Sequence, residues 1–193
     1  MARPSMAEQR KTEILDALEA CILEQGIQET SLENIAEKAG MKRTILRHYI
    51  GNRDDIICAL SHRWKAKYSE QWAEAVKWLP KSNQHIALLD GLFAVGSKQA
   101  VQETIIGDEL FSEARRLTQV KEDQNAIMSE FIEHFNQVLT EMYPNAKPEN
   151  IELVSYGVYS SYLMSKSMVL LELVEPIHKL KHSAILLCNT LIV

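Results

Sequence analysis

The sequence predicts an all-α protein, and three observations lead to that fold class. Glycine and proline together number 12 of the 193 residues, which is about half of average usage. Because tight turns need these two residues, we expect few turns and long helices. Apolar residues recur at three- and four-residue steps along most of the chain, whereas no alternating pattern typical of a strand extends beyond a few residues.

The expected helices can be placed from this periodicity and from their capping residues. The first follows the apolar repeat that starts at Ile14, and Gly26 lies where a C-terminal cap belongs. A second should run to Gly40 from Thr30, which has capping-box spacing with Glu33, or from the alternative cap Ser31. The remaining expected helices cover residues 42–50, 54–79, 85–98, 101–117, 121–142, 149–172 and 176–191.

Charge is distributed unevenly along the chain. The net charge is −5, yet residues 38–53 contain five basic side chains and no acidic one. This basic window therefore carries +5 and leaves −10 for the rest of the chain. A short basic segment on an acidic protein is typical of a local contact with a polyanion, although an ordinary solvated face is the alternative.

Residues 31–50 have the form of a helix-turn-helix. Ala36 and Ala39 are small enough to let two short helices cross closely, and Gly40 can adopt the left-handed conformation of the turn. Ile45, Leu46 and Tyr49 can then face inward. The open face keeps side chains that contact phosphates or the acceptors on guanine edges, namely Lys42, Arg43, Thr44, Arg47 and His48. The basic window coincides with this second helix, which favours binding to double-stranded DNA.

Here the chain resembles the TetR-type transcriptional regulators. The resemblance covers about 50 residues and is carried by segments 14–17, 25–26, 30–32, 34–36, 39–41 and 45–56. It implies a DNA-binding domain over residues 1–53 and a helical ligand-binding and dimerisation domain over residues 54–193.

The resemblance also implies roles for single residues. Thr30 or Ser31 would hydrogen-bond a phosphate, and Arg53 would anchor the DNA backbone where the family usually has lysine. Three further positions depart from the family, since Arg47, Ile50 and Lys42 stand where Tyr, Phe and a capping Ser are common. The expected DNA-binding residues are Thr30, Ser31, Lys42, Arg43, Thr44, Arg47, His48, Tyr49 and Arg53.

In proteins of this kind an effector enters the helical core and moves the DNA-reading heads apart. An aromatic lining would suit a small apolar or flat effector, although plain core packing is the alternative for each candidate. The candidate ligand-binding residues are Trp64, Tyr68, Trp72, Phe93, Phe111, Met128, Phe131, Tyr156 and Tyr159. His85 and His134 could bind a polar group, but we expect no metal and no cofactor. Asp108, Glu109, Arg115 and Arg116 are expected to be surface charges.

The last two predicted helices carry an apolar seam formed by Leu180, Ala184, Leu187, Cys188 and Leu191. The resemblance implies that these two helices pair with their twofold mates in a homodimer, while closure of the monomer core is the alternative. A homodimer would place two recognition helices one DNA turn apart, about 34–36 Å, on a palindromic operator.

Other classes of protein fit the sequence poorly. It has no Gly-rich phosphate loop and no catalytic signature motif, so we do not expect an enzyme. Cys58 and His62 are four residues apart, but their helix carries an apolar stripe, which favours a structural role. Three cysteines cannot form a disulfide framework. The longest weakly charged stretch, residues 154–171, contains Lys166, so no membrane span is predicted. The N-terminus does not read as a signal peptide, and a cytoplasmic location is therefore expected.

The sequence thus predicts a ligand-responsive transcriptional regulator, most simply a repressor that an apolar or aromatic effector releases from its operator. The alternative is an all-helical small-molecule-binding or interaction protein whose helix-turn-helix no longer contacts DNA. Steeply salt-dependent binding to duplex DNA would distinguish the first from the second.

Overall fold

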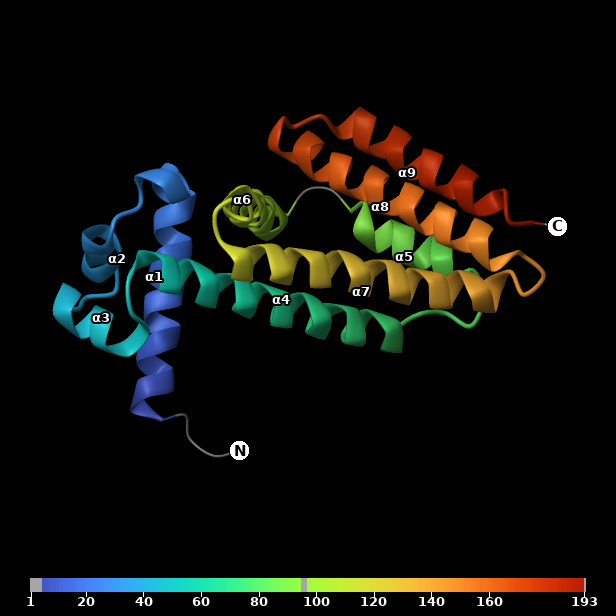
Figure 1. The fold of residues 1–193 in the computed structure, drawn as a ribbon. Coiled ribbons are helices and arrows are strands. Elements are labelled where there is room, and N and C mark those ends of the chain that lie inside the picture. The colour runs from blue at the N-terminus through green and yellow to red at the C-terminus, as the bar shows by residue number, and fades with distance from the viewer. Residues whose placement is uncertain (1–4, 95–96, 193) are drawn as a thin grey trace. The chain divides into compact units, whose positions relative to one another are not determined.

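A computed structural model describes residues 5–94 and 97–192, and all regular structure within these ranges is helical (Figure 1). The predicted all-α fold is confirmed. The helices are α1 (Met6–Glu29), α2 (Leu32–Lys38), α3 (Arg43–Ile50), α4 (Arg53–Lys77), α5 (Gln84–Leu92), α6 (Lys98–Glu113), α7 (Thr118–Met142), α8 (Pro148–Leu170) and α9 (Val174–Asn189).

Most predicted helix boundaries lie within a few residues of the observed ones. Gly26, predicted as the C-terminal cap of the first helix, instead forms a kink inside α1, whose C-cap is Thr30. The boundary of α5 differs most. It ends at Leu92, whereas the expected helix extended to residue 98; its residues 95 and 96 lie outside the described ranges. The chain leaves helical geometry at Phe93, whose ring is 3% exposed and packs edge-on against Tyr162, with the ring centroids 6.3 Å apart. Burial of this aromatic ring therefore accompanies the end of the helix.

The chain forms two compact units, each with its own core. The first unit contains the residues up to Lys67 together with Ile105–Gln124. Its core is aliphatic, and the side chains with no exposed surface are Ile14, Leu18, Ile27, Ile35, Leu46, Ile56, Ile57, Leu60 and Val120. All described residues of the expected DNA-binding domain, 1–53, belong to this unit.

Two glycines shape the chain on either side of α3. Gly40 has a φ of +62° in the turn between α2 and α3, where the N–H of Met41 donates to the carbonyl of Ala36 at 3.0 Å. Gly51 has a φ of +97° between α3 and α4. L-residues with a side chain rarely adopt such conformations, so both turns depend on glycine.

The second unit contains Tyr68–Thr104 and the chain from Asn125 onward. Its core is more aromatic, with Phe131 and Phe135 fully buried. Helices α8 and α9 lie antiparallel and side by side (Figure 1). They approach closely at Gly157, where an added Cβ would lie 2.8 Å from Cδ1 of Leu187.

Within the described ranges, no helix is long and apolar enough to cross a membrane. The same residues contain no group of three or more His, Cys, Asp or Glu side chains that could hold a metal ion.

Candidate nucleic-acid interface and ligand cavity

Helix α3 is held in the first unit by one fully buried side chain, Leu46, with Tyr49 and Ile50 partly buried beside it. These three positions recur at i, i+3 and i+4, so they share one face of the helix. The opposite side is exposed to solvent and contains Lys42, Arg43, Thr44, Ile45, Arg47 and His48. The structure therefore gathers five of the predicted DNA-binding residues on one open face, which we call the α3 face. Tyr49 lies at its edge, with its ring 5.5 Å from that of His48 in an edge-on arrangement.

Some basic side chains of the basic window form ion pairs with acidic side chains, and others do not. Lys38 is paired with Glu24, with Nζ 2.5 Å from Oε1, and Arg43 is paired with Glu33 of α2. In the part of the chain that the structure describes, no acidic side chain pairs with Lys42 or Arg47. Two cations of the α3 face are thus available to a polyanion without breaking an internal ion pair.

Ile45 was predicted to face inward, and this prediction is wrong. Its side chain is 45% exposed, because it lies one position before Leu46 and is rotated away from the inward face by about 100°. An exposed isoleucine among cations can contact the methyl group of thymine, so Ile45 joins the candidate base-reading residues.

Thr30 and Ser31 both lie at the corner between α1 and α2, but in different environments. Thr30 is 2% exposed, and its hydroxyl donates to the carbonyl of Gly26 at 2.8 Å. Ser31 is the N-cap of α2, where its Oγ accepts from the N–H of Asn34 at 3.2 Å and the N–H of Ser31 donates to Oδ1 of Asn34 at 2.9 Å. The capping box therefore uses Ser31 and Asn34 instead of Thr30 and Glu33.

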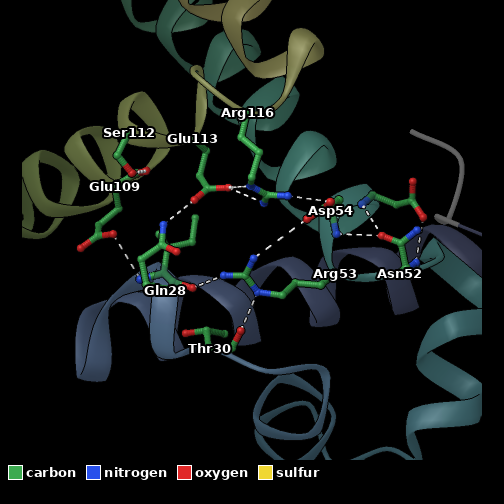
Figure 2. A network of polar contacts seen from close by, with 11 residues as sticks. Gln28, Thr30, Asn52, Arg53, Asp54, Glu109, Ser112, Glu113 and Arg116 are labelled. Carbon is green, nitrogen blue, oxygen red and sulfur yellow. Dashed lines mark hydrogen bonds and ion pairs between the residues drawn. The ribbon is translucent and has the colours of Figure 1, made fainter.

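Arg53, at the start of α4, turns its guanidinium toward this same corner (Figure 2). Its Nε donates to the carbonyl of Thr30 at 2.7 Å, and Nη2 donates to the carbonyl of Ile27. Two carbonyls that follow the kink in α1 at Gly26 are thereby satisfied by one planar side chain. In this structure Arg53 connects α4 with the helix-turn-helix.

Side chains from α6 and the segment after it complete this network (Figure 2). Glu109 accepts from the backbone N–H of Ile27 at 3.2 Å, and buried Glu113 accepts from Nε2 of Gln28 at 2.6 Å. Arg116 donates to Glu113 at 2.5 Å and to Oδ2 of Asp54 at 2.7 Å.

The hydrogen bond from Arg116 lowers the pKa of Asp54. Glu109 and Arg116 were expected to be surface charges; Arg116 is exposed and Glu109 is half-buried, and both also make long-range hydrogen bonds. Their partners lie 82 and 62 residues away in the chain, where no local sequence pattern reveals them.

The second unit contains a cavity of about 570 Å³. Its walls are mostly apolar and aromatic, and Lys166 and Glu103 are the charged side chains that line it. The aromatic lining residues are Tyr68, Trp72, Trp78 and Tyr162. A cavity of this size and character is typical of a site for a small molecule.

The candidate ligand-binding residues have several different positions. Tyr68 and Trp72 line the cavity. Trp64 and Phe111 belong to the first unit, where the indole N–H of Trp64 donates to Glu19 at 2.7 Å and Phe111 is 65% exposed. Tyr156 is 45% exposed on α8. The others pack in the second unit, with Phe131 and Phe93 buried, the Tyr159 ring tilted against that of Phe131 at 4.8 Å between centroids, and Met128 half-buried on α7.

Sequence reasoning missed Trp78, Tyr162, Glu103 and Lys166 as cavity residues. Lys166 had left one usable signal, because it is a lone cation within the apolar stretch 154–171.

The two histidines considered as ligands have separate surroundings. His85 is 5% exposed, and its Nε2 lies 3.2 Å from the hydroxyl of Tyr143. His134 stacks on Trp72, with the ring centroids 5.4 Å apart.

The pair formed by Cys58 and His62 also has a third neighbour, since Nδ1 of His62 lies 3.7 Å from Oδ1 of buried Asp123. Burial raises the pKa of the Cys58 thiol, which disfavours the thiolate that nucleophilic catalysis needs.

Comparison with known proteins bears on the first unit and on the fold. Residues 14–60 match the bacterial regulatory proteins of the tetR family. No curated protein matches the chain.

Several solved structures share the fold at low sequence identity. A TetR transcription regulator from Haloarcula marismortui is 14% identical, with 94% of this chain and 97% of that chain covered and a TM-score of 0.79. A transcriptional regulator from Rhodococcus sp. Rha1 is 14% identical, with 94% and 95% covered and a TM-score of 0.78. A TetR-like regulator from the same organism is 21% identical, with 97% of both chains covered and a TM-score of 0.68.

The helix-turn-helix that exposes the α3 face is thus the segment that matches the family, and the remaining helices complete the fold seen in these regulators. Residues 14–60, which contain the helix-turn-helix, match the tetR family of bacterial regulatory proteins, and the chain shares its fold with solved structures of TetR regulators.

Proposed function

We propose that this protein is a homodimeric, cytoplasmic repressor that binds a palindromic operator and releases it when a small molecule occupies the cavity of the second unit. The observation that carries the proposal is the α3 face. Among the residues that the structure describes, Lys42 and Arg47 have no ion-pair partner there, and they lie next to the exposed Thr44 and Ile45.

The residues of the α3 face differ in the part of DNA that each can contact. Lys42 and Arg47 suit phosphates or guanine edges, while Thr44 and Ile45 suit the thymine methyl or other base edges. Arg43 reaches DNA only after its ion pair with Glu33 is broken or shared. Thr30 and Arg53 contribute indirectly, because their hydrogen bonds hold the corner from which α2 and α3 project.

A homodimer is supported by an apolar stripe on the exposed side of α8. Leu153, Tyr156, Leu163 and Met164 are 70%, 45%, 47% and 50% exposed, and their spacing places them along one side of the helix. The seam predicted on α9 lies elsewhere, since Ala184, Cys188 and Leu191 pack into the core of the monomer. Cover by a second copy would remove the exposed stripe from water.

Release by an effector is supported by the position of the cavity in the chain. Its lining includes residues of α4 and α6, and the same two helices provide Arg53 and Glu109 to the corner in the first unit. A ligand that prefers one arrangement of these helices would shift the population of DNA-binding dimers.

Selection from a random duplex DNA library, followed by fluorescence anisotropy at several salt concentrations, tests the proposal. We expect an enriched palindrome with half-sites about one DNA turn apart. We also expect log K to fall steeply with log salt, in proportion to the neutralised phosphates. Arg47→Ala should reduce both the affinity and the salt slope, with exposed Lys121→Ala of the same unit as control. A chain without any enriched sequence, also after refolding to strip ligand, would instead be a helical ligand-binding protein.

A further inference from the structure

Within the described residues, the ammonium group that lines the cavity of the second unit has no ion-pair partner. Lys166 of α8 is half-buried, and its Nζ lies 4.8 Å from the centre of the Tyr162 ring, in cation–π geometry. No side chain in the part of the chain that the structure describes forms an ion pair or a hydrogen bond with this ammonium. The aromatic face of Tyr162 replaces only part of the hydration that burial removes.

A buried hydroxyl in the same cavity also lacks a hydrogen bond. Tyr68 of α4 lines the cavity, and its hydroxyl oxygen is buried without a hydrogen-bond partner among the described residues. The Trp72 indole can only donate toward that oxygen, so the hydroxyl proton has no acceptor. Burial and the neighbouring Tyr162 raise the pKa of Tyr68, so the hydroxyl stays protonated. Lys166 and Tyr68 are thus two donors beside Tyr162 that both need an acceptor.

Glu103 of α6 lines the cavity as well, but its carboxylate is engaged elsewhere and accepts a hydrogen bond from Nε2 of Gln99 at 3.0 Å. It forms no ion pair with Lys166 and acts on it from a distance, where it opposes the lowering of the Lys166 pKa by burial. An anion on the side of Lys166 away from Glu103 would feel more attraction than repulsion, because Coulomb energy falls with distance.

The two donors fit a carboxylate. One of its oxygens can accept from Lys166 while the other accepts from Tyr68. A neutral hydroxyl would leave the positive charge of Lys166 uncompensated in a poorly hydrated site. A phosphate dianion would bring a second negative charge, for which the described lining has no second cation.

The rest of the lining suits a flat apolar body. The Trp72 ring is held by stacking on His134, with 13° between the planes, and by edge-on contact with Phe131 at 5.5 Å between the centroids. The Tyr162 ring is stacked on Phe131, with the centroids 5.7 Å apart. Aromatic rings held in this way form a preformed surface for a planar apolar group.

We propose that the cavity binds a carboxylate attached to a flat apolar ring system, with the anion held by Lys166 and Tyr68 and the ring against Trp72 and Tyr162. This inference rests on the proposed function, in which the ligand of the cavity is the effector, and adds the chemical class of that effector.

Isothermal titration calorimetry of the full-length protein with three naphthalene derivatives tests the inference. The probes share one ring system and are 2-naphthoate, 2-naphthylmethanol and 2-naphthylmethylammonium. We expect 2-naphthoate to bind at least about tenfold more tightly than each of the others, because only its carboxylate both compensates the charge of Lys166 and accepts two hydrogen bonds. Equal or tighter binding of the alcohol or of the ammonium would overturn the inference.

Two variants report on the donors themselves. Lys166→Met should weaken 2-naphthoate binding at least about tenfold and change 2-naphthylmethanol binding by no more than about twofold. Tyr68→Phe should weaken 2-naphthoate binding by a smaller factor, about threefold to tenfold, because one neutral donor is lost. Lys147→Met, at the exposed N-cap of α8, removes the same charge outside the cavity and should change neither. Equal losses for Lys147→Met and Lys166→Met would contradict the assigned role of Lys166. The wild-type ranking of the probes stands as a test even if one variant does not fold.

DNA binding separates this inference from the proposed function. If 2-naphthoate binds as predicted but leaves operator affinity unchanged, the inference about the ligand holds and effector-controlled release is wrong. If no probe binds while the palindrome is still recognised, the inference is wrong and the DNA-binding part of the proposed function holds.

Discussion

The carboxylate of Glu109 on α6 accepts a hydrogen bond from the backbone N–H of Ile27 at 3.2 Å, immediately after the kink in α1. Ile27 is fully buried, so water cannot replace this acceptor. Glu109→Ala should therefore lower the free energy of unfolding by about 1–3 kcal/mol, the cost of an unsatisfied buried donor. Glu109→Gln keeps a carbonyl oxygen and should cost less. Urea unfolding measures both, and the neighbouring exposed Asp108→Ala is the control. Equal losses for Glu109→Ala and Asp108→Ala would show that the bond contributes nothing specific.

The ion pair between Arg43 and Glu33 restrains a cation of the α3 face. Both side chains are about half exposed, so the pair contributes at most about 1 kcal/mol. Glu33→Gln should free Arg43 and raise the affinity for duplex DNA by up to about fivefold. Anisotropy at fixed salt measures this change. Glu37→Gln removes the same charge from an exposed position of α2 and should raise the affinity less; an equal rise would mean that only the overall charge matters.

The two left-handed glycines beside α3 should differ in their tolerance of alanine. At Gly51 an added Cβ would lie 2.3 Å from Oδ2 of Asp55, an oxygen that accepts from the N–H of Asn52 at 2.8 Å. At Gly40 the space is open to 4 Å. Gly40→Ala should cost about 1–2 kcal/mol from its φ alone. Gly51→Ala should cost more, because Asp55 must also give up its hydrogen bond. Thermal and urea unfolding of both variants compare them, and a smaller loss at Gly51 would refute this ranking.

Helix positions and the helix-turn-helix could be predicted from the sequence because they depend on local signals. The repeat of apolar residues, the cap at Ser31 and the turn at Gly40 all act within a few residues of each other. The side chains of Lys42, Arg47 and His48 were placed correctly on the exposed face for the same reason. Ile45 was misplaced because an eight-residue helix offers too few turns to fix the direction of its inward face.

The remaining features depend on distant contacts. Arg116 reads as a surface charge in sequence, and only the fold brings it to Asp54, 62 residues away. Aromatic side chains fill a core and line a cavity equally well, so composition could not separate buried Phe131 from cavity-lining Trp78. Lys166 differs from both, because a cation in an apolar helix indicates a polar site, but the other helices that line its cavity are far away in the chain.

The exposed stripe on α8 should determine the oligomeric state. Leu163→Glu would place a carboxylate in the proposed interface of each copy. Because the dimer is twofold symmetric, two carboxylates would lose their hydration when it forms. We expect the variant to sediment as a monomer at concentrations where the wild type is a dimer. Phe111→Glu, on an exposed position of α6 in the first unit, is the matched control and should remain dimeric. A monomeric wild type, or dimers in both variants, would exclude this stripe as the interface.

The last prediction concerns His85, which is 5% exposed and faces the hydroxyl of Tyr143. Burial lowers the pKa of His85 below its ordinary value of 6.5, so the folded protein keeps this ring neutral. As the pH falls below that value, the unfolded chain binds a proton that the folded chain does not. The free energy of unfolding should therefore decrease by at most about 1.4 kcal/mol per pH unit on account of this group.

Urea unfolding between about pH 7.5 and about pH 5 measures the effect, since this range spans the titration of an unfolded histidine. His85→Gln removes the titrating ring, so the stability difference between wild type and variant should be largest near neutral pH and shrink toward acid. A constant difference for His85→Gln across the range would mean that the buried ring is protonated in the folded protein as readily as in the unfolded chain.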